Sequence, residues 1–237
     1  MRLRVESQSS SGIPAETQED DFAPQQIAES AIYTPTEKAD FYQRYLERER
    51  RTGFKKLLSE SENWPLNWRH ALDEALAKTP LALGYAARLS TDDQIKFLNR
   101  MLALGYHDNR AAEAFVDLVS ASSLNEIVSR LNELNHLGER SENDSPASGM
   151  YFMKRLAERA GELSPDAQKL FAKIVMDFNI FENDFRSNEA FRRQVLLAMF
   201  AQINPDALGI VLDELQSTYE TSGLLRLLSG EFEATQE

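Results

Sequence analysis

The sequence of 237 residues contains no cysteine. Such a chain forms no disulfide, offers no thiolate to a metal ion and has no cysteine nucleophile. This composition is typical of the reducing cytoplasm, where we expect the protein to be located. Long apolar runs are also lacking, since no window approaches the roughly 18 apolar residues that predict a membrane-spanning helix. The opening Met-Arg-Leu-Arg-Val-Glu-Ser precedes no apolar stretch, so we expect no general secretion signal, and a leaderless secretion route is the alternative.

The motifs of common catalytic and cofactor sites are absent as well. The sequence has no glycine-rich phosphate loop, no HExxH, no GxSxG and no dinucleotide fingerprint. His70, His107 and His136 lie far apart, and the helix dipole explains a histidine near a helix C-terminus such as His107. Adjacent acids such as Asp92 and Asp93 point about 100° apart on a helix, so they do not converge on one ion. We therefore predict no catalytic residue, no metal ligand and no cofactor.

The pattern of amphipathic helices is present from residue 34 onward. Thr34 precedes Pro35 and lies three residues before Glu37, which is the signature of a capping box with proline at the first helical position. Apolar residues then recur three and four apart, as on the buried stripe of a helix, and alternating strand patterns are missing. Further helix starts are predicted at Thr79-Pro80, at Ser123 with Glu126, at Ser164-Pro165 and at Asn204-Pro205. The predicted fold is all-α, either a multi-helix bundle or a short α-solenoid.

Composition divides the chain into five parts. Residues 1–33 are rich in Ser, Gln, Glu, Asp and Pro, and we predict a disordered tail there because they bury too little apolar surface to offset ordering entropy. Residues 138–149 are polar or small and predict a loop between two helical halves, and the last residues predict a frayed acidic end. The predicted parts are a tail at 1–33, helical halves at 34–137 and 150–229, a loop at 138–149 and a frayed end at 230–237.

The two halves resemble each other. Segments 89–97 and 163–171 share Leu, Ser, Asp, Gln and Phe at the same places, and shorter matches follow in the same order. This pattern is consistent with two copies of a three-helix unit, near 89–137 and 163–217, stacked as in helical-repeat proteins. The other interpretation is that well-capped amphipathic helices resemble each other without common origin.

Charge gives the clearest indication of a binding surface. The net charge is −12, which repels nucleic acid and anionic membranes and attracts a basic partner. Against this background, Arg44, Arg48, Arg51 and Lys55 follow spacings of four, three and four, which predicts one basic helix face, with Tyr45 among the apolar residues nearby. The face is interpreted either as a docking surface for an acidic partner, a phosphate-bearing ligand or a membrane, or as a solvated face paired within the molecule.

Trp64 and Trp68 are four residues apart at the expected start of the next helix. Buried aromatic residues dominate interface energetics, so the pair is a candidate anchor for a partner. The alternative is that both indoles pack the first helix onto the rest of the bundle.

We predict from these features a non-enzymatic, adaptor- or scaffold-type protein that binds a protein partner through helical surfaces. A leaderless secreted bacterial effector or secretion-apparatus protein is one alternative, suggested by a polar tail ahead of a helical body. An acidic immunity or inhibitor protein is another, suggested by the net charge. No pattern in the sequence indicates the oligomeric state.

Overall fold

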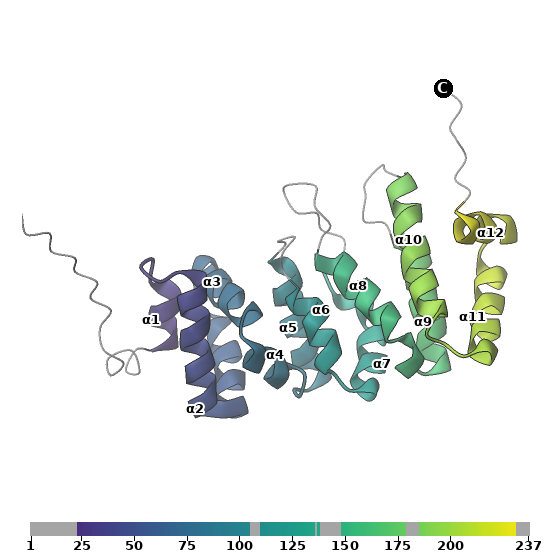
Figure 1. The fold of residues 1–237 in the computed structure, drawn as a ribbon. Coiled ribbons are helices and arrows are strands. Elements are labelled where there is room, and N and C mark those ends of the chain that lie inside the picture. The colour runs from purple at the N-terminus through teal and green to yellow at the C-terminus, as the bar shows by residue number, and fades with distance from the viewer. Residues whose placement is uncertain (1–22, 105–109, 136, 138–147, 179–184, 231–237) are drawn as a thin grey trace, which may run out of the picture.

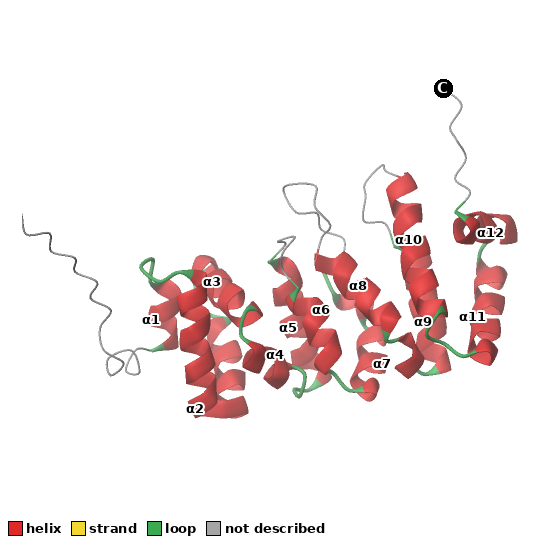
Figure 2. Ribbon diagram, viewed as in Figure 1, coloured by secondary structure: helices red, strands yellow, loops and turns green. Residues whose placement is uncertain are grey.

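The computed structural model describes residues 23–104, 110–135, 137, 148–178 and 185–230. These residues form twelve α-helices and two short 3-10 helices, and no strand occurs among them (Figures 1 and 2). The predicted all-α fold is therefore confirmed. None of the helices in this part of the chain has the length and apolarity needed to cross a bilayer.

The helices form two parallel rows that run the length of the molecule (Figure 1). Even-numbered helices pack on the next even-numbered helix, odd-numbered helices pack on the next odd-numbered one, and neighbours along the chain join the rows. This is the architecture of a short α-solenoid. One row contains α2 (Pro35–Ser61), α4 (Pro80–Ala86), α6 (Ala111–Leu118), α8 (Ser148–Glu158), α10 (Phe185–Phe200) and α12 (Thr221–Ser229). The other contains α1 (Pro24–Glu29), α3 (Leu66–Ala77), α5 (Thr91–Ala103), α7 (Ala121–Ser129), α9 (Pro165–Asp177) and α11 (Pro205–Thr218), with η2 (Leu131–Glu133) and η3 (Ala160–Glu162) in the connections.

Four helices of the second row begin in the same way. A cap residue follows an apolar one, and the cap side chain accepts a hydrogen bond from the amide three residues on, which satisfies a free N–H of the first turn. The caps of α5, α7, α9 and α11 are Ser90, Ser120, Ser164 and Asn204. The predicted starts at Ser164 and Asn204 are confirmed, as is the capping box of Thr34 and Glu37 at α2.

Two predicted caps are wrong in detail. Ser123 does not begin a helix with Glu126, because Ser120 is the cap of α7 and its hydroxyl accepts from the Ser123 amide at 3.2 Å. Thr79 precedes α4 as predicted, but its hydroxyl does not cap that helix. It donates at 2.8 Å to the carbonyl of Ala75 at the end of α3, because this side chain is buried between helices.

The tail predicted for residues 1–33 is too long at its C-terminal end. Pro24–Glu29 form α1, whose Ile27 and Ala28 are buried. The Lys38 ammonium donates to the Ala28 carbonyl at 3.0 Å, and the Tyr42 hydroxyl donates to the Pro24 carbonyl at 2.7 Å. These contacts order a segment whose average composition is that of a tail. Residues 1–22 lie outside the described part of the chain.

The internal similarity has a clear structural counterpart. Gln94 in α5 and Gln168 in α9 occupy the same place after the cap, are both buried, and each donates at 2.9 Å to a carbonyl of the preceding turn. Phe97 and Phe171, three residues further on, are fully buried. The units predicted near 89–137 and 163–217 thus correspond to α5–α7 and α9–α11. Whether they arose by duplication stays a prediction.

Most of the predicted central loop lies outside the described residues. Beyond it α8 packs against both α6 and α10, so the rows continue from one predicted half into the other. At the C-terminus α12 ends at Gly230, whose left-handed backbone (φ 78°) closes the helix as glycine commonly does. The rest of the predicted frayed end, from residue 231 onward, lies outside the described residues.

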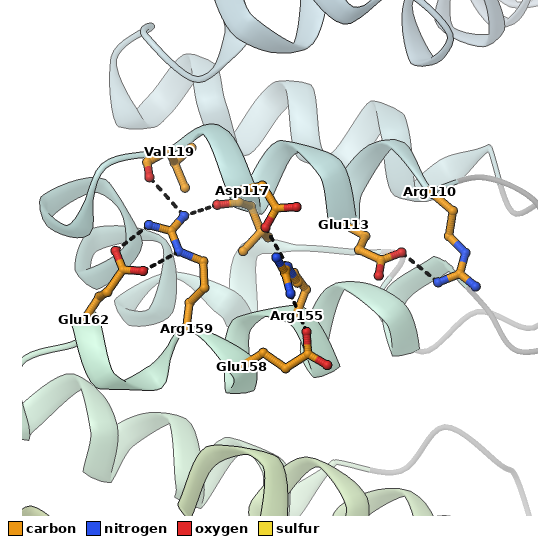
Figure 3. A network of polar contacts seen from close by, with 9 residues as sticks. Arg110, Glu113, Asp117, Val119, Arg155, Glu158, Arg159 and Glu162 are labelled. Carbon is orange, nitrogen blue, oxygen red and sulfur yellow. Dashed lines mark hydrogen bonds and ion pairs between the residues drawn. The ribbon is translucent and has the colours of Figure 1, made fainter. Parts of the chain in front are cut away.

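Arginines connect neighbouring helices of the stack. Figure 3 shows those between α6 and α8, where Arg155 pairs with Asp117 at 2.5 Å and with Glu158 at 2.6 Å. Arg159 donates to the carbonyl of Val119 (Figure 3) and to that of Val116, and so satisfies acceptors that the end of α6 leaves free. Such staples fix one helix on the next within a row.

Candidate functional site

Helix α2 is kinked at Arg50. This residue has φ 59° and ψ −159°, and among the described non-glycine residues it alone has a positive φ. Gly53 lies one turn on, where a β-carbon would overlap the β-carbon of Glu49, so the kink needs a glycine at this position. Strained backbone of this kind costs about 1–3 kcal/mol and is concentrated at functional sites.

The kink divides the predicted basic face. The spacing of four, three and four assumes an unbroken helix, whereas Arg44 and Arg48 precede the break and Arg51 and Lys55 follow it. Arg48 pairs with Glu49 at 3.1 Å, and its guanidinium carbon lies 6.0 Å from the centre of the Tyr45 ring.

Tyr45 belongs to the aromatic packing of the first part of α2. It is partly buried, and its ring stacks on that of Phe41 with 6.4 Å between the ring centres. The structure therefore groups Tyr45, Arg44 and Arg48 on the segment before the kink.

Arg51 and Lys55 line a cleft with residues from elsewhere in the chain. The cleft lies between the part of α2 after the kink and the turn from α4 into α5, and its volume is about 620 Å³. Its lining, which we call the cationic cleft, consists of Arg51, Thr52, Lys55, Lys56, Ser59, Arg88, Leu89 and Ser90. Four of these eight side chains are cationic, in a chain of net charge −12.

The lysines and the arginines of the cleft differ in their pairing. Lys55 lies 3.3 Å from Asp93, and Lys56 lies 3.7 Å from Glu60. In the part of the chain that the structure describes, Arg51 and Arg88 have no ion-pair or hydrogen-bond partner. The uncompensated charge of the cleft is thus concentrated on two guanidinium groups.

Asp93 is held as a carboxylate at the edge of the cleft. The Ser90 hydroxyl donates to it at 2.8 Å and is the main cause of a lowered Asp93 pKa, while burial opposes this effect and Lys55 adds to it. Asp93 therefore stays ionised at neutral pH and balances Lys55. The charge available to a ligand is that of the arginines.

A smaller recess of about 150 Å³ opens beside the cleft and shares Lys55, Ser59 and Leu89 with it. Its other lining residues are Leu58, Glu62, Asp93, Lys96, Phe97 and Arg100. Leu58 and Leu89 are partly buried and Phe97 is fully buried, so the recess has an apolar floor. Its cations are paired, Lys96 with Glu62 at 3.8 Å and Arg100 with Asp73 at 2.5 Å. We call this space the inner recess.

Trp64 and Trp68 line neither the cleft nor the recess. Trp64 precedes the helix and Trp68 lies in the first turn of α3, so their spacing of four residues does not place them on one helix face. Both are partly buried and pack against the hydrophobic core. This arrangement agrees with the packing role weighed for the pair.

The cationic cleft presents groups that form ion pairs and hydrogen bonds. Its lining offers cations, hydroxyls and one leucine, and the hydroxyl of Ser90 donates to the Asp93 carboxylate at the edge of the cleft. His70 is on α3, where its Nε2 lies 3.5 Å from Glu74, and His107 and His136 lie outside the described residues. Among the residues that are described, no three histidine or acidic side chains gather as metal ligands would.

Arg88 is the residue that sequence reasoning missed. It lies 37 positions after Arg51 and reaches the cleft only because α4 packs against α2. The one local signal is that an arginine stands two residues before the serine cap of a helix, which is too common a pattern to indicate a site.

Comparison of the chain with models of known protein families, with curated proteins and with solved structures finds no match. The stack and its cationic cleft are therefore the features from which a function is proposed.

Proposed function

We propose that this protein is a non-enzymatic adaptor or scaffold that binds another protein through the surface of its helical stack. Two rows of short helices offer an extended surface, which is the common use of α-solenoids. We place the adaptor in the cytoplasm, because a stack without cysteine depends on no oxidising compartment.

The observation that carries the proposal is the pair of arginines in the cationic cleft. Arginine is the residue best suited to recognise a carboxylate, because its planar fork forms two parallel hydrogen bonds. Several other arginines of the stack are paired, as Arg155 is with Asp117. Arg51 and Arg88 are without such partners in the described residues, which leaves their donors available to another molecule.

The kink in α2 supports the same position. A positive φ at a non-glycine residue persists only where the surrounding structure enforces it. Arg50 immediately precedes Arg51. The strained residue therefore sets the direction of the part of α2 that lines the cleft. The cationic cleft is therefore our proposed docking position.

The test compares charge reversal inside and outside the cleft. Tagged full-length protein is prepared as the wild type, as Arg51→Glu with Arg88→Glu, and as Arg44→Glu with Arg48→Glu, a control with the same charge change on the other side of the kink. Each is used for affinity purification from the source cell, and each retained protein is then purified and remixed with the three forms for sedimentation analysis.

We expect a partner that forms a defined complex with the wild type and the control but not with the cleft variant. Equal binding by the cleft variant would remove the cleft from the proposal. If no protein is retained and the chain instead turns over a small molecule, the adaptor function itself is wrong.

A further inference from the structure

Of six cations that line the cationic cleft and the inner recess, four are already paired. Lys55, Lys56, Lys96 and Arg100 each have a carboxylate within 3.8 Å. The two that remain, Arg51 and Arg88, come from the two elements that border the cleft. A ligand that matches this arrangement carries a small number of anionic groups, about one for each arginine.

The inner recess adds an apolar requirement. Its volume of about 150 Å³ is well below the range of pockets that hold whole small molecules, which begins at about 300 Å³. Leu58 and Leu89 supply its accessible apolar surface, since Phe97 is fully buried. Space of this size suits one apolar side chain that is attached to a longer ligand in the adjoining cleft.

The charge of the remaining chain decides between a short and a long anionic ligand. Nucleic acid and anionic membranes need many cations along one surface, and the field of a chain with net charge −12 repels them beyond the cleft. Neighbouring arginines of the stack, such as Arg155 and Arg130, are neutralised by acids. A short ligand avoids this repulsion because it contacts only the cleft.

We infer that the cationic cleft binds a short acidic linear segment of a partner protein, whose carboxylates bind Arg51 and Arg88 and whose apolar side chain enters the inner recess. This inference rests on the proposed adaptor function and names the kind of partner. It also predicts the composition of the motif, which contains acidic residues and one apolar residue.

The probes are short dye-labelled peptides in a Gly/Ser background, with one apolar residue (Leu, Ile, Met or Phe) between glutamates. Matched peptides carry serine at the apolar position or lysine in place of the glutamates. Fluorescence anisotropy measures their binding to the full-length protein, with inorganic pyrophosphate as a competitor. The protein variants are Arg51→Ala, Arg88→Ala and the control Arg44→Ala, all at exposed positions, and circular dichroism checks their helix content.

We expect at least one acidic apolar peptide to bind, with affinity reduced about tenfold by Arg51→Ala and by Arg88→Ala, since each removes a charge-assisted interaction. Arg44→Ala leaves affinity unchanged, serine at the apolar position weakens it about tenfold, and added salt weakens it further. The lysine peptide does not bind.

The inference is overturned if no peptide of the panel binds, if the serine peptide binds as well as its apolar match, or if Arg44→Ala weakens binding as much as the cleft variants. Pyrophosphate binding without peptide binding likewise overturns it, in favour of a phosphate site. If the peptides fail while the double charge reversal still abolishes a purified complex, the adaptor function stands and only the acidic-segment inference fails.

Discussion

The buried ion pair between Asp73 of α3 and Arg100 of α5 allows a quantitative test of how the stack is held together. The Arg100 Nε donates to the Asp73 carboxylate at 2.7 Å, and Nη1 donates to the Ser61 hydroxyl at 3.0 Å. Only 8% of the Asp73 side chain and 15% of the Arg100 side chain are exposed. Arg100→Met keeps the apolar stem and removes the cation, which leaves a carboxylate buried without its partner.

The expected loss is large because the partner charge remains. Breaking a buried pair at one side costs about 3–5 kcal/mol, whereas replacing both partners by apolar residues is often close to neutral. We therefore expect Arg100→Met to lose about 3–5 kcal/mol of unfolding free energy, and Asp73→Leu with Arg100→Met to recover most of it. Against a total stability of about 5–15 kcal/mol, the single change is easily measured.

The loss should depend on pH in a defined direction. Burial raises the pKa of Asp73, and the Arg100 guanidinium opposes that rise. Without Arg100 the pKa of the folded state rises further above the unfolded value of about 3.9. A carboxyl with a raised folded pKa loses stability as pH increases through that pKa, so the deficit of Arg100→Met against the wild type shrinks as the pH is lowered.

Urea denaturation followed by far-ultraviolet circular dichroism, at neutral and at acidic pH, measures both effects for the wild type, the two single variants and the double variant. A loss of less than about 1 kcal/mol for Arg100→Met would contradict a buried ion pair that stabilises the stack. An equal loss at both pH values, or a double variant no more stable than Arg100→Met, would contradict it as well.

Three further predictions concern local structure, and the same denaturation assay measures each. Ser120→Ala should lower the free energy of unfolding by about 1 kcal/mol, because Ser120 caps α7, and Ser123→Ala should lower it by less than half of that. A larger loss for Ser123→Ala would instead support Ser123 as the cap. Arg50→Gly should raise the free energy of unfolding by about 1 kcal/mol, because glycine adopts the positive φ without strain. Gly53→Ala should lower it by about 1–3 kcal/mol, because the added β-carbon overlaps Glu49. If Arg50→Gly also lowered it, the result would argue against the kink. Arg159→Met should lower the free energy of unfolding by about 1–3 kcal/mol, because it leaves carbonyls of α6 without a donor. Arg155→Met breaks partly exposed ion pairs and should lower it by less than about 1 kcal/mol. Equal losses for the two variants would contradict this difference.

Features that depend on near neighbours in the chain were predictable from the sequence. The caps at Thr34, Ser164 and Asn204 can be identified from residues within one helical turn. The apolar stripes can be identified from the helical period of the sequence. Ser120 and Ser123 both stand before apolar residues. Ser120, which caps α7 in the structure, also follows the buried Val119, just as the other three caps of this row follow an apolar residue.

The end of the tail shows the same limit. Composition averaged over the first 33 residues hides Ile27 and Ala28, which are buried once Lys38 and Tyr42 bind the backbone of α1. These contacts depend on tertiary packing between segments, and composition alone does not predict such packing.

The cationic cleft was half predictable. Arg51 and Lys55 were identified because they are four apart after the kink, where the helical spacing holds. Arg44 and Arg48 were grouped with them because nothing at Arg50 signals a positive φ, and the only trace of the break is Gly53. Arg88 could not be found, because its place in the cleft follows from the packing of α4 on α2.

The two-row stack has a mechanical consequence. Each helix packs only on its near neighbours, from α1 at one end to α12 at the other. Small rotations at successive interfaces therefore add along the molecule, and the distance between its ends changes without any single interface coming apart. We therefore expect the end-to-end distance to depend on many small changes along the stack and not on a single hinge.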